Sequence, residues 1–193
     1  MKPPKPLPTE RPFLTLYTNT FRRPDGLAKC LASVGQQTAV DDLEQIVLPD
    51  HSGYGVAGGL FGRLPWYADA VRGQYVNLLC DDDVLASADV VAKVKAFAED
   101  RQGPPLIVVN VQKGSTVFPG VPPEGEPICG SVDLTSYIVR ADLWRAYLEK
   151  YEPVYEGDWW FAHALYRAGV PAAFCDVLWA IGAQSNGRPE VDY

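Results

Sequence analysis

The most informative part of this chain is the run Tyr75-Val76-Asn77-Leu78-Leu79-Cys80-Asp81-Asp82-Asp83. Its apolar half is typical of a buried strand, and it stops at three adjacent carboxylates, which repel one another and are costly to bury without a partner. In an extended chain residues i and i+2 point the same way, so Asp81 and Asp83 are expected to face one site while Asp82 points elsewhere. A divalent cation would relieve the repulsion, and carboxylate oxygens suit Mg²⁺ or Mn²⁺. The alternative is a solvated acidic turn at the start of the next helix.

Strand-like and helix-like patterns alternate on both sides of this run. Strands are expected at 13–18, 45–48, 75–80, 106–111, 135–139 and 172–177, and helices at 27–34, 66–71, 87–97, 142–148 and 158–167. A long loop rich in proline and glycine is expected at 113–127. The alternation predicts an α/β domain with a mostly parallel central sheet flanked by helices, in which ligands bind beyond the carboxyl ends of the strands.

Length and composition fit one folded domain. The chain has 193 residues, of which 47% are hydrophobic and 21% are charged, as in ordinary globular proteins. Residues 1–12 contain five prolines and three basic side chains, so they are predicted to form a flexible tail ahead of a single domain at 13–193. The net charge of −7 argues against a nucleic-acid partner.

Neither a membrane anchor nor an oxidising compartment is indicated. No apolar run is long enough for a transmembrane segment, and the N-terminal residues do not have the pattern of a signal peptide. The four cysteines are far apart in sequence and form no Cys-x-x-Cys pair, so they are interpreted as reduced thiols. A cytoplasmic protein is therefore expected.

Five segments resemble, in order, the motifs of the family 2 glycosyltransferases, which have the GT-A fold. They are the opening strand and Thr-x-x-Arg turn, the helix after it, the second strand with its acidic end, the strand leading into a DxD motif, and a later acidic motif, at 14–23, 27–34, 46–52, 73–83 and 156–161. The resemblance spans about residues 13–180. It implies an inverting, metal-dependent enzyme that moves a sugar from a nucleotide-diphosphate sugar, with UDP as the expected nucleotide, to an acceptor hydroxyl of unspecified kind.

The resemblance also assigns roles to individual residues. Asp81 and Asp83 would hold Mn²⁺ or Mg²⁺ against the donor diphosphate, which gains negative charge as the glycosidic bond breaks. Asp158 would be the general base, its pKa tuned by burial or by neighbouring Glu156. The other donor-binding residues would be Thr18, Asn19, Arg22, Asp50 and Asp82. The acceptor-binding residues would be Cys129, Gly130, Glu156, Trp159 and Trp160.

The sequence departs from the family pattern in ways that keep other readings open. Pro49 replaces one acid of the second motif, and Gln184 stands near the place of a late histidine that many relatives carry. Asp158 could instead be a helix N-cap. One alternative function is a non-catalytic nucleotide-sugar or glycan-binding scaffold on a decayed GT-A fold. A nucleotidyltransferase is disfavoured, because no glycine precedes Gly26 after the first strand.

Overall fold

The computed structural model describes residues 11–50, 62–120, 125–131, 133–154 and 156–182. The predicted tail at 1–12 lies outside this part of the chain except for its last two residues, and Gln184 also lies outside it. Among the described residues, the helices are all too short or too polar to cross a membrane.

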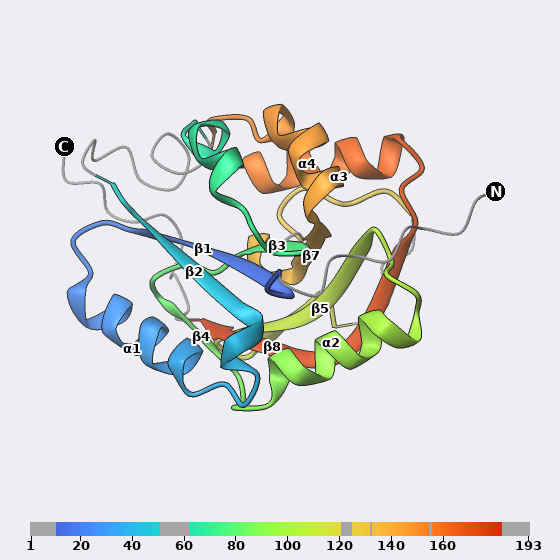
Figure 1. Cartoon of the computed structure of the whole chain (residues 1–193). Helices are drawn as coiled ribbons and strands as arrows, with labels where there is room; N and C mark the ends of the chain where they lie inside the picture. The colour runs from blue at the N-terminus through green and yellow to red at the C-terminus, as the bar shows by residue number, and fades with distance from the viewer. Residues whose placement is uncertain (1–10, 51–61, 121–124, 132, 155, 183–193) are drawn as a thin grey trace.

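A single eight-stranded sheet forms the centre of the molecule (Figure 1). Its strands are β1 (Leu14–Thr20), β2 (Leu43–Pro49), β3 (Tyr75–Leu78), β4 (Asp83–Leu85), β5 (Leu106–Lys113), β6 (Thr116–Phe118), β7 (Tyr137–Arg140) and β8 (Ala172–Gly182). The order is β2-β1-β3-β7-β5-β8-β4, with β6 paired to β5. The strands expected from the sequence are all present, and β4 and β6 are additional.

The sheet is mixed, which corrects the expectation of a mostly parallel one. β1 runs parallel to β2 and β3, and β5 runs parallel to β8. The pairs β3–β7, β5–β7, β5–β6 and β4–β8 are antiparallel. Parallel neighbours need a long crossover, whereas the chain after β5 turns back at Gly114 and forms β6 within the predicted loop. At this point the alternation of strand and helix is interrupted, and both β6 and β7 run antiparallel to β5 before β8 pairs with β5 in parallel.

Helices cover both faces of the sheet, and each face has its own core (Figure 1). α1 (Pro24–Gly35) and α2 (Val90–Asp100) pack on one face through Cys30, Val34 and Val94. α3 (Ala141–Tyr147) and α4 (Gly157–Arg167) pack on the other through Trp144 and Phe161. Four 3₁₀ helices complete the described elements: η1 (Val40–Asp42), η3 (Leu64–Ala70), η4 (Leu134–Ser136) and η5 (Leu148–Lys150). The helix expected at 66–71 is thus the 3₁₀ helix η3.

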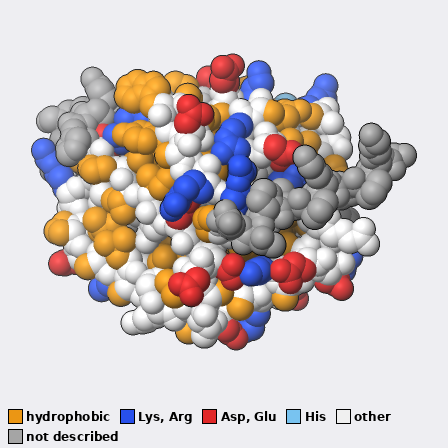
Figure 2. All heavy atoms as spheres, in the orientation of Figure 1, with side chains coloured by type: hydrophobic (Ala, Val, Ile, Leu, Met, Phe, Trp, Pro, Cys, Tyr) orange, Lys and Arg blue, Asp and Glu red, His pale blue; other side chains and the backbone are white. Residues whose placement is uncertain are grey.

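The register of the parallel strands β1, β2 and β3 brings the segments that follow them to the same edge of the sheet. Thr20 at the end of β1 pairs with Pro49 at the end of β2, and the acidic turn follows β3 on the other side of β1. On the face that Figure 2 shows, Lys and Arg side chains are interspersed with Asp and Glu side chains. The candidate site lies at the carboxyl ends of β1, β2 and β3, as expected for this class of sheet.

Candidate active site

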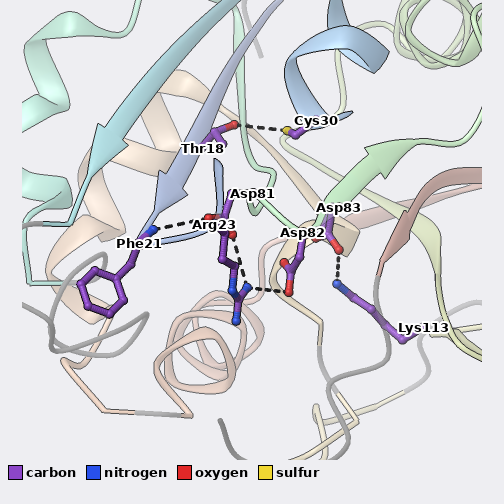
Figure 3. A network of polar contacts seen from close by, with 9 residues as sticks. Thr18, Phe21, Arg23, Cys30, Asp81, Asp82, Asp83 and Lys113 are labelled. Carbon is purple, nitrogen blue, oxygen red and sulfur yellow. Dashed lines mark hydrogen bonds and ion pairs between the residues drawn. The ribbon is translucent and has the colours of Figure 1, made fainter. Parts of the chain in front are cut away.

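The three aspartates form a turn, and this changes how they are grouped. The backbone N–H of Asp83 donates to the carbonyl of Cys80 at 3.0 Å, so residues 80–83 are not extended. The rule that i and i+2 point the same way therefore does not apply, and the predicted pairing of Asp81 with Asp83 is not formed. Asp81 and Asp82 instead share one cation, Arg23, and Asp83 pairs with Lys113 (Figure 3).

The first group is Arg23 with Asp81 and Asp82, called here the Arg23 cluster. Nη1 of Arg23 lies 3.3 Å from Oδ1 of Asp81 and 2.7 Å from Oδ2 of Asp82. The backbone N–H of Phe21 also donates to Asp81 at 3.4 Å. Burial raises the pKa of Asp81, against the hydroxyl of Thr20 and the charge of Arg23. The Arg23 side chain is 50% exposed and that of Asp82 is 28% exposed, whereas that of Asp81 is buried, so this cluster is open to solvent on the side of Arg23 and Asp82.

The second group is Lys113 with Asp83 and Asp133, called here the Lys113 cluster. Nζ of Lys113 pairs with the fully buried Asp83 and lies 3.7 Å from Oδ2 of Asp133. The hydroxyl of Thr135 donates to the other oxygen of Asp83 at 2.9 Å. Burial raises the pKa of Asp83 to about 6, against the opposing effect of the Lys113 charge. A side chain at Gly182 would collide with both Asp83 and Lys113, so the neighbouring strand β8 comes as close as a glycine permits.

A possible metal-binding group overlaps both clusters. Ligand atoms of Cys80, Asp82 and Asp83 lie within 4.8 Å of one another. Burial raises the pKa of the Cys80 thiol well above its ordinary value, and the negative charge of Asp83 raises it further. Asp82 belongs both to this group and to the Arg23 cluster, and its side chain is partly exposed.

A hollow of about 490 Å³ adjoins the Arg23 cluster at the ends of β1 and β2. It is lined by Thr20, Phe21, Arg22, Arg23, Pro24, Leu27, Pro49 and Asp50. Two of the predicted donor residues, Arg22 and Asp50, therefore border it. The guanidinium of Arg22 lies 4.9 Å from the centre of the Phe21 ring, and the side chain of Asp50 is buried.

Arg63, which was not predicted from the sequence, connects the residues at the ends of β1 and β2. It donates to the carbonyl of Pro49 at 2.7 Å and to Oδ1 of Asn19 at 3.1 Å, and it lies 3.9 Å from Asp50. The predicted Asn19 is thus held beside Asp50. The predicted Thr18 points elsewhere: its hydroxyl accepts from Gln45 at 2.8 Å and lies against Cys30 of α1 (Figure 3).

Asp158 lies in the first turn of α4. Its Oδ1 accepts the N–H of Trp159 at 2.8 Å, while Glu156 holds the N-cap position, so the N-cap interpretation of Asp158 is wrong. Burial raises the pKa of Asp158 to about 6, against the Trp159 N–H, and the negative charges of Asp133 and Glu156 raise it further. Asp133 therefore connects the two regions, since it contacts Lys113 and acts electrostatically on Asp158.

The segment at 125–131, which contains Cys129 and Gly130, is bound to α4. Nε1 of Trp159 donates to the carbonyl of Pro127 at 2.8 Å, and Trp159 stacks on His163 with ring centres 5.0 Å apart. His163 in turn contacts Glu126 at 2.7 Å. The predicted acceptor residues Cys129 and Trp160 are both exposed close to this contact. Most of the predicted acceptor residues are thus gathered around the start of α4.

Comparison with known proteins places this geometry in a known fold. No protein-family model matches the chain, and no curated protein matches it in sequence. Crystal structures do match: S. aureus TarS has a TM-score of 0.66 at 13% identity, over 88% of this chain and 36% of that one. The chain has a GT-A-like glycosyltransferase fold.

Two further structures of this fold hold nucleotide sugars. S. aureus TarS 1–349 in complex with UDP-GlcNAc has a TM-score of 0.64 at 13% identity, over 91% of this chain and 59% of that one. The mannosyltransferase PcManGT from Pyrobaculum calidifontis, in complex with GDP-Man and Mn²⁺, has a TM-score of 0.62 at 14% identity, over 98% of this chain and 61% of that one. The chain thus spans between about a third and three fifths of the length of these structures.

Proposed function

We propose that the protein transfers a sugar from a nucleotide-diphosphate sugar to an acceptor hydroxyl, with inversion and with a divalent metal ion. The observation that carries this proposal is the Arg23 cluster, in which two carboxylates of one turn converge on a cation beside an open hollow. It lies at the carboxyl ends of the parallel strands, where ligands of such sheets bind. Structures of the same fold with UDP-GlcNAc, or with GDP-Man and Mn²⁺, support the choice of donor and ion.

The residues of the turn fit a hard divalent cation. Asp82, together with Asp81, would hold Mn²⁺ or Mg²⁺, because both offer carboxylate oxygens next to the hollow. Asp83 is taken up by Lys113 and Thr135 and would position the turn, a role that differs from the metal ligation predicted for it from the sequence. When bound, the ion would stabilise the negative charge that develops on the departing nucleotide diphosphate.

The hollow would accept the nucleotide part of the donor. Asp50, held by Arg63, would accept an N–H of the base, and Arg22 would lie near the phosphates. Uracil and guanine both present a ring N–H beside a carbonyl group, so UDP-linked and GDP-linked sugars are the two donor classes to compare. UDP is the first choice, in agreement with the expectation from the sequence.

Asp158 would act as the general base. Its carboxylate would take the proton of the acceptor hydroxyl while the hydroxyl oxygen attacks the anomeric carbon, and the bond to the nucleotide diphosphate would break on the opposite face of the sugar. A pKa of about 6 leaves Asp158 ionised at neutral pH and makes it a better base than an ordinary aspartate. The exposed ring of Trp160 and the segment at 125–131 would border the acceptor.

The test is sugar transfer from UDP-GlcNAc and GDP-Man, with Mn²⁺, measured for the wild type and for Asp158→Asn. We expect kcat to fall by about 10² to 10⁴, as is typical when a general base is removed, while the donor Kd changes by less than about twofold. Asp142→Asn is the matched control, because Asp142 also lies in the first turn of a helix and accepts the next backbone N–H at 2.8 Å. Equal turnover in Asp158→Asn and the wild type would remove Asp158 from the reaction. Donor binding with no turnover in the wild type would favour the alternative function, a non-catalytic scaffold that binds nucleotide sugars.

A further inference from the structure

Arg23 lies in the position that the proposed function gives to a divalent ion. A single nitrogen of its guanidinium contacts Asp81 at 3.3 Å and Asp82 at 2.7 Å (Figure 3). The two carboxylates and one guanidinium carry a net charge of −1, whereas the carboxylates alone would carry −2. A divalent cation prefers the second state, so Arg23 and the ion compete for the same oxygens.

The contacts of Arg23 are of a kind that an ion can displace. The side chain is half exposed, and it comes from the short connection between β1 and α1. Ion pairs this open to solvent contribute little to stability, because water screens the attraction and both side chains lose freedom when they pair. Lys113 differs in its own exposure, which is 22% against 50% for Arg23, although each cation has one buried carboxylate partner, Asp83 or Asp81.

Arg23 also has a second place to go. It lines the hollow that the proposed function gives to the nucleotide, together with Arg22 and Asp50. A diphosphate bound there would carry negative charge within reach of a guanidinium, and guanidinium groups form paired hydrogen bonds with phosphates. The donor would thus draw Arg23 away from the same carboxylates that the metal ion requires.

We propose that Arg23 is a built-in counter-cation that closes the metal site of the free protein and moves to the donor diphosphate when the ion binds. This inference rests on the proposed function. Binding of the ion and binding of the donor would then favour each other. The ion displaces Arg23 from the two carboxylates, and the donor diphosphate holds Arg23 away from them. It also identifies a residue that couples the two ligands without being a ligand of the metal.

The experiment is the Kd for Mn²⁺ in the absence of donor, measured by electron paramagnetic resonance of free Mn²⁺ for the wild type, Arg23→Gln and Arg22→Gln. We expect Mn²⁺ to bind about tenfold more tightly to Arg23→Gln, since a direct competing charge is removed. Arg22→Gln is the matched control: it removes the same charge one residue away, where the guanidinium lies on the Phe21 ring, and we expect a change of less than about threefold. Arg23→Lys keeps the charge without the planar fork and should give an intermediate Kd.

The coupling is measured in the same variants by repeating the Mn²⁺ titration with saturating UDP or GDP. In the wild type the nucleotide should tighten Mn²⁺ binding, and in Arg23→Gln this gain should be reduced by about tenfold, because the competitor is already absent. An unchanged Mn²⁺ Kd in Arg23→Gln, equal gains in Arg22→Gln and Arg23→Gln, or no Mn²⁺ binding in any variant would each overturn the inference. The proposed function is judged separately by donor binding and sugar transfer in the wild type, so the two failures can be told apart.

Discussion

The Arg23 cluster and the Lys113 cluster have the same composition and opposite surroundings. Each holds one cation between two aspartates. One aspartate of each cluster comes from the same turn: Asp82 belongs to the Arg23 cluster and Asp83 to the Lys113 cluster. The Asp83 side chain is 0% exposed and that of Lys113 is 22% exposed, against 28% for Asp82 and 50% for Arg23, while Asp81 is the buried member of the Arg23 cluster. Buried ion pairs cannot be broken without leaving an uncompensated charge, whereas open ones exchange partners readily. The buried cluster is therefore assigned to structure and the open cluster to ligand binding.

The buried cluster also explains how the turn is held in place. Lys113 ends β5, Asp83 begins β4, and Asp133 precedes η4, so one ammonium group connects three segments. Asn77 of β3 supports the same region, since its amide donates to the carbonyls of Thr135 and Tyr137 at 2.9 Å. The position of Asp82 thus depends on buried contacts made by its neighbour.

The largest expected effect on stability is that of Lys113→Met, which leaves Asp83 buried without its cation. Removing one partner of a buried ion pair typically costs about 3–5 kcal/mol, so the free energy of unfolding should fall by that amount in urea denaturation. A loss below about 1 kcal/mol would mean that the two clusters do not differ as proposed.

Gly182→Ala tests how closely β8 is packed against the buried cluster. The added methyl group would meet Asp83 and Lys113, and overpacking of this kind costs about 1–3 kcal/mol. Gly35→Ala is the control, because among the described residues no atom outside its chain neighbours and the backbone of α1 lies within 4 Å of the methyl group it would add. Its melting temperature should stay level or rise slightly, since alanine favours the helix. Equal effects of the two substitutions would contradict the close packing at Gly182.

The pH dependence of sugar transfer links Asp158 to the buried cluster. As a base, Asp158 must be ionised, so kcat/KM should rise with pH and level off above its pKa of about 6. Because Asp133 raises this pKa, Asp133→Asn should move the acidic limb to lower pH. A limb that stays in place, in a variant that is folded and active, would show that Asp133 does not act on the base.

The same shift has a stability consequence of defined sign. The pKa of Asp158 is higher in the folded protein than in the unfolded chain, so the folded state holds the proton more tightly. Ionisation of Asp158 should therefore lower stability as pH rises from about 4 to about 6, and Asp158→Asn should weaken that decline. Asp142→Asn should have the opposite effect and make the decline of stability with pH steeper. Hydrogen bonding to Arg140 lowers the pKa of Asp142, so ionisation of Asp142 raises the stability of the wild type as pH rises. Chemical denaturation of the three proteins at several pH values measures both slopes.

The smallest expected effect on stability is that of Arg23→Gln. Because the Arg23 guanidinium is half exposed, and buried Asp81 keeps the backbone N–H of Phe21 as a partner, the free energy of unfolding should change by less than about 1 kcal/mol. A loss as large as that of Lys113→Met would make Arg23 a structural residue. The urea midpoints of the two variants give the comparison directly.

Much of the fold followed from the sequence, because the pattern of apolar residues reports which faces are buried. The strands and helices before Lys113 lie within a few residues of their predicted places. The antiparallel pairing of β6 with β5, and of β7 with β3 and β5, was missed, since periodicity does not report which strands become neighbours. Asp133 and Lys113 were missed for the same reason: one lies next to a loop and the other at a strand end, and only the sheet order brings them to Asp83.

The candidate site was predicted in part. The acidic turn was singled out by residue type and position, and Asp158 and Asp50 by the resemblance to the family 2 glycosyltransferases; Asp50 does border the hollow. Which aspartate of the turn pairs with which cation was not predictable. The pairing depends on the hydrogen bond from the Asp83 N–H to the Cys80 carbonyl, which ends the extended geometry. The resemblance also named Thr18 as a donor residue, but its hydroxyl lies on the α1 face of the sheet, against Cys30 and Gln45. The cation partners of the three aspartates come from segments far away in sequence.

The most direct test of the central proposal, that Asp81 and Asp82 form a metal-dependent donor site, is calorimetric titration of UDP-GlcNAc and GDP-Man with and without Mn²⁺. It should be done on the wild type, on Asp82→Asn and on Asp89→Asn, the last being a control at an exposed position before α2. We expect one donor to bind only when Mn²⁺ is present, with a loss of at least about tenfold in Asp82→Asn and none in Asp89→Asn. Donor binding that is the same without Mn²⁺ and the same in Asp82→Asn would contradict the account.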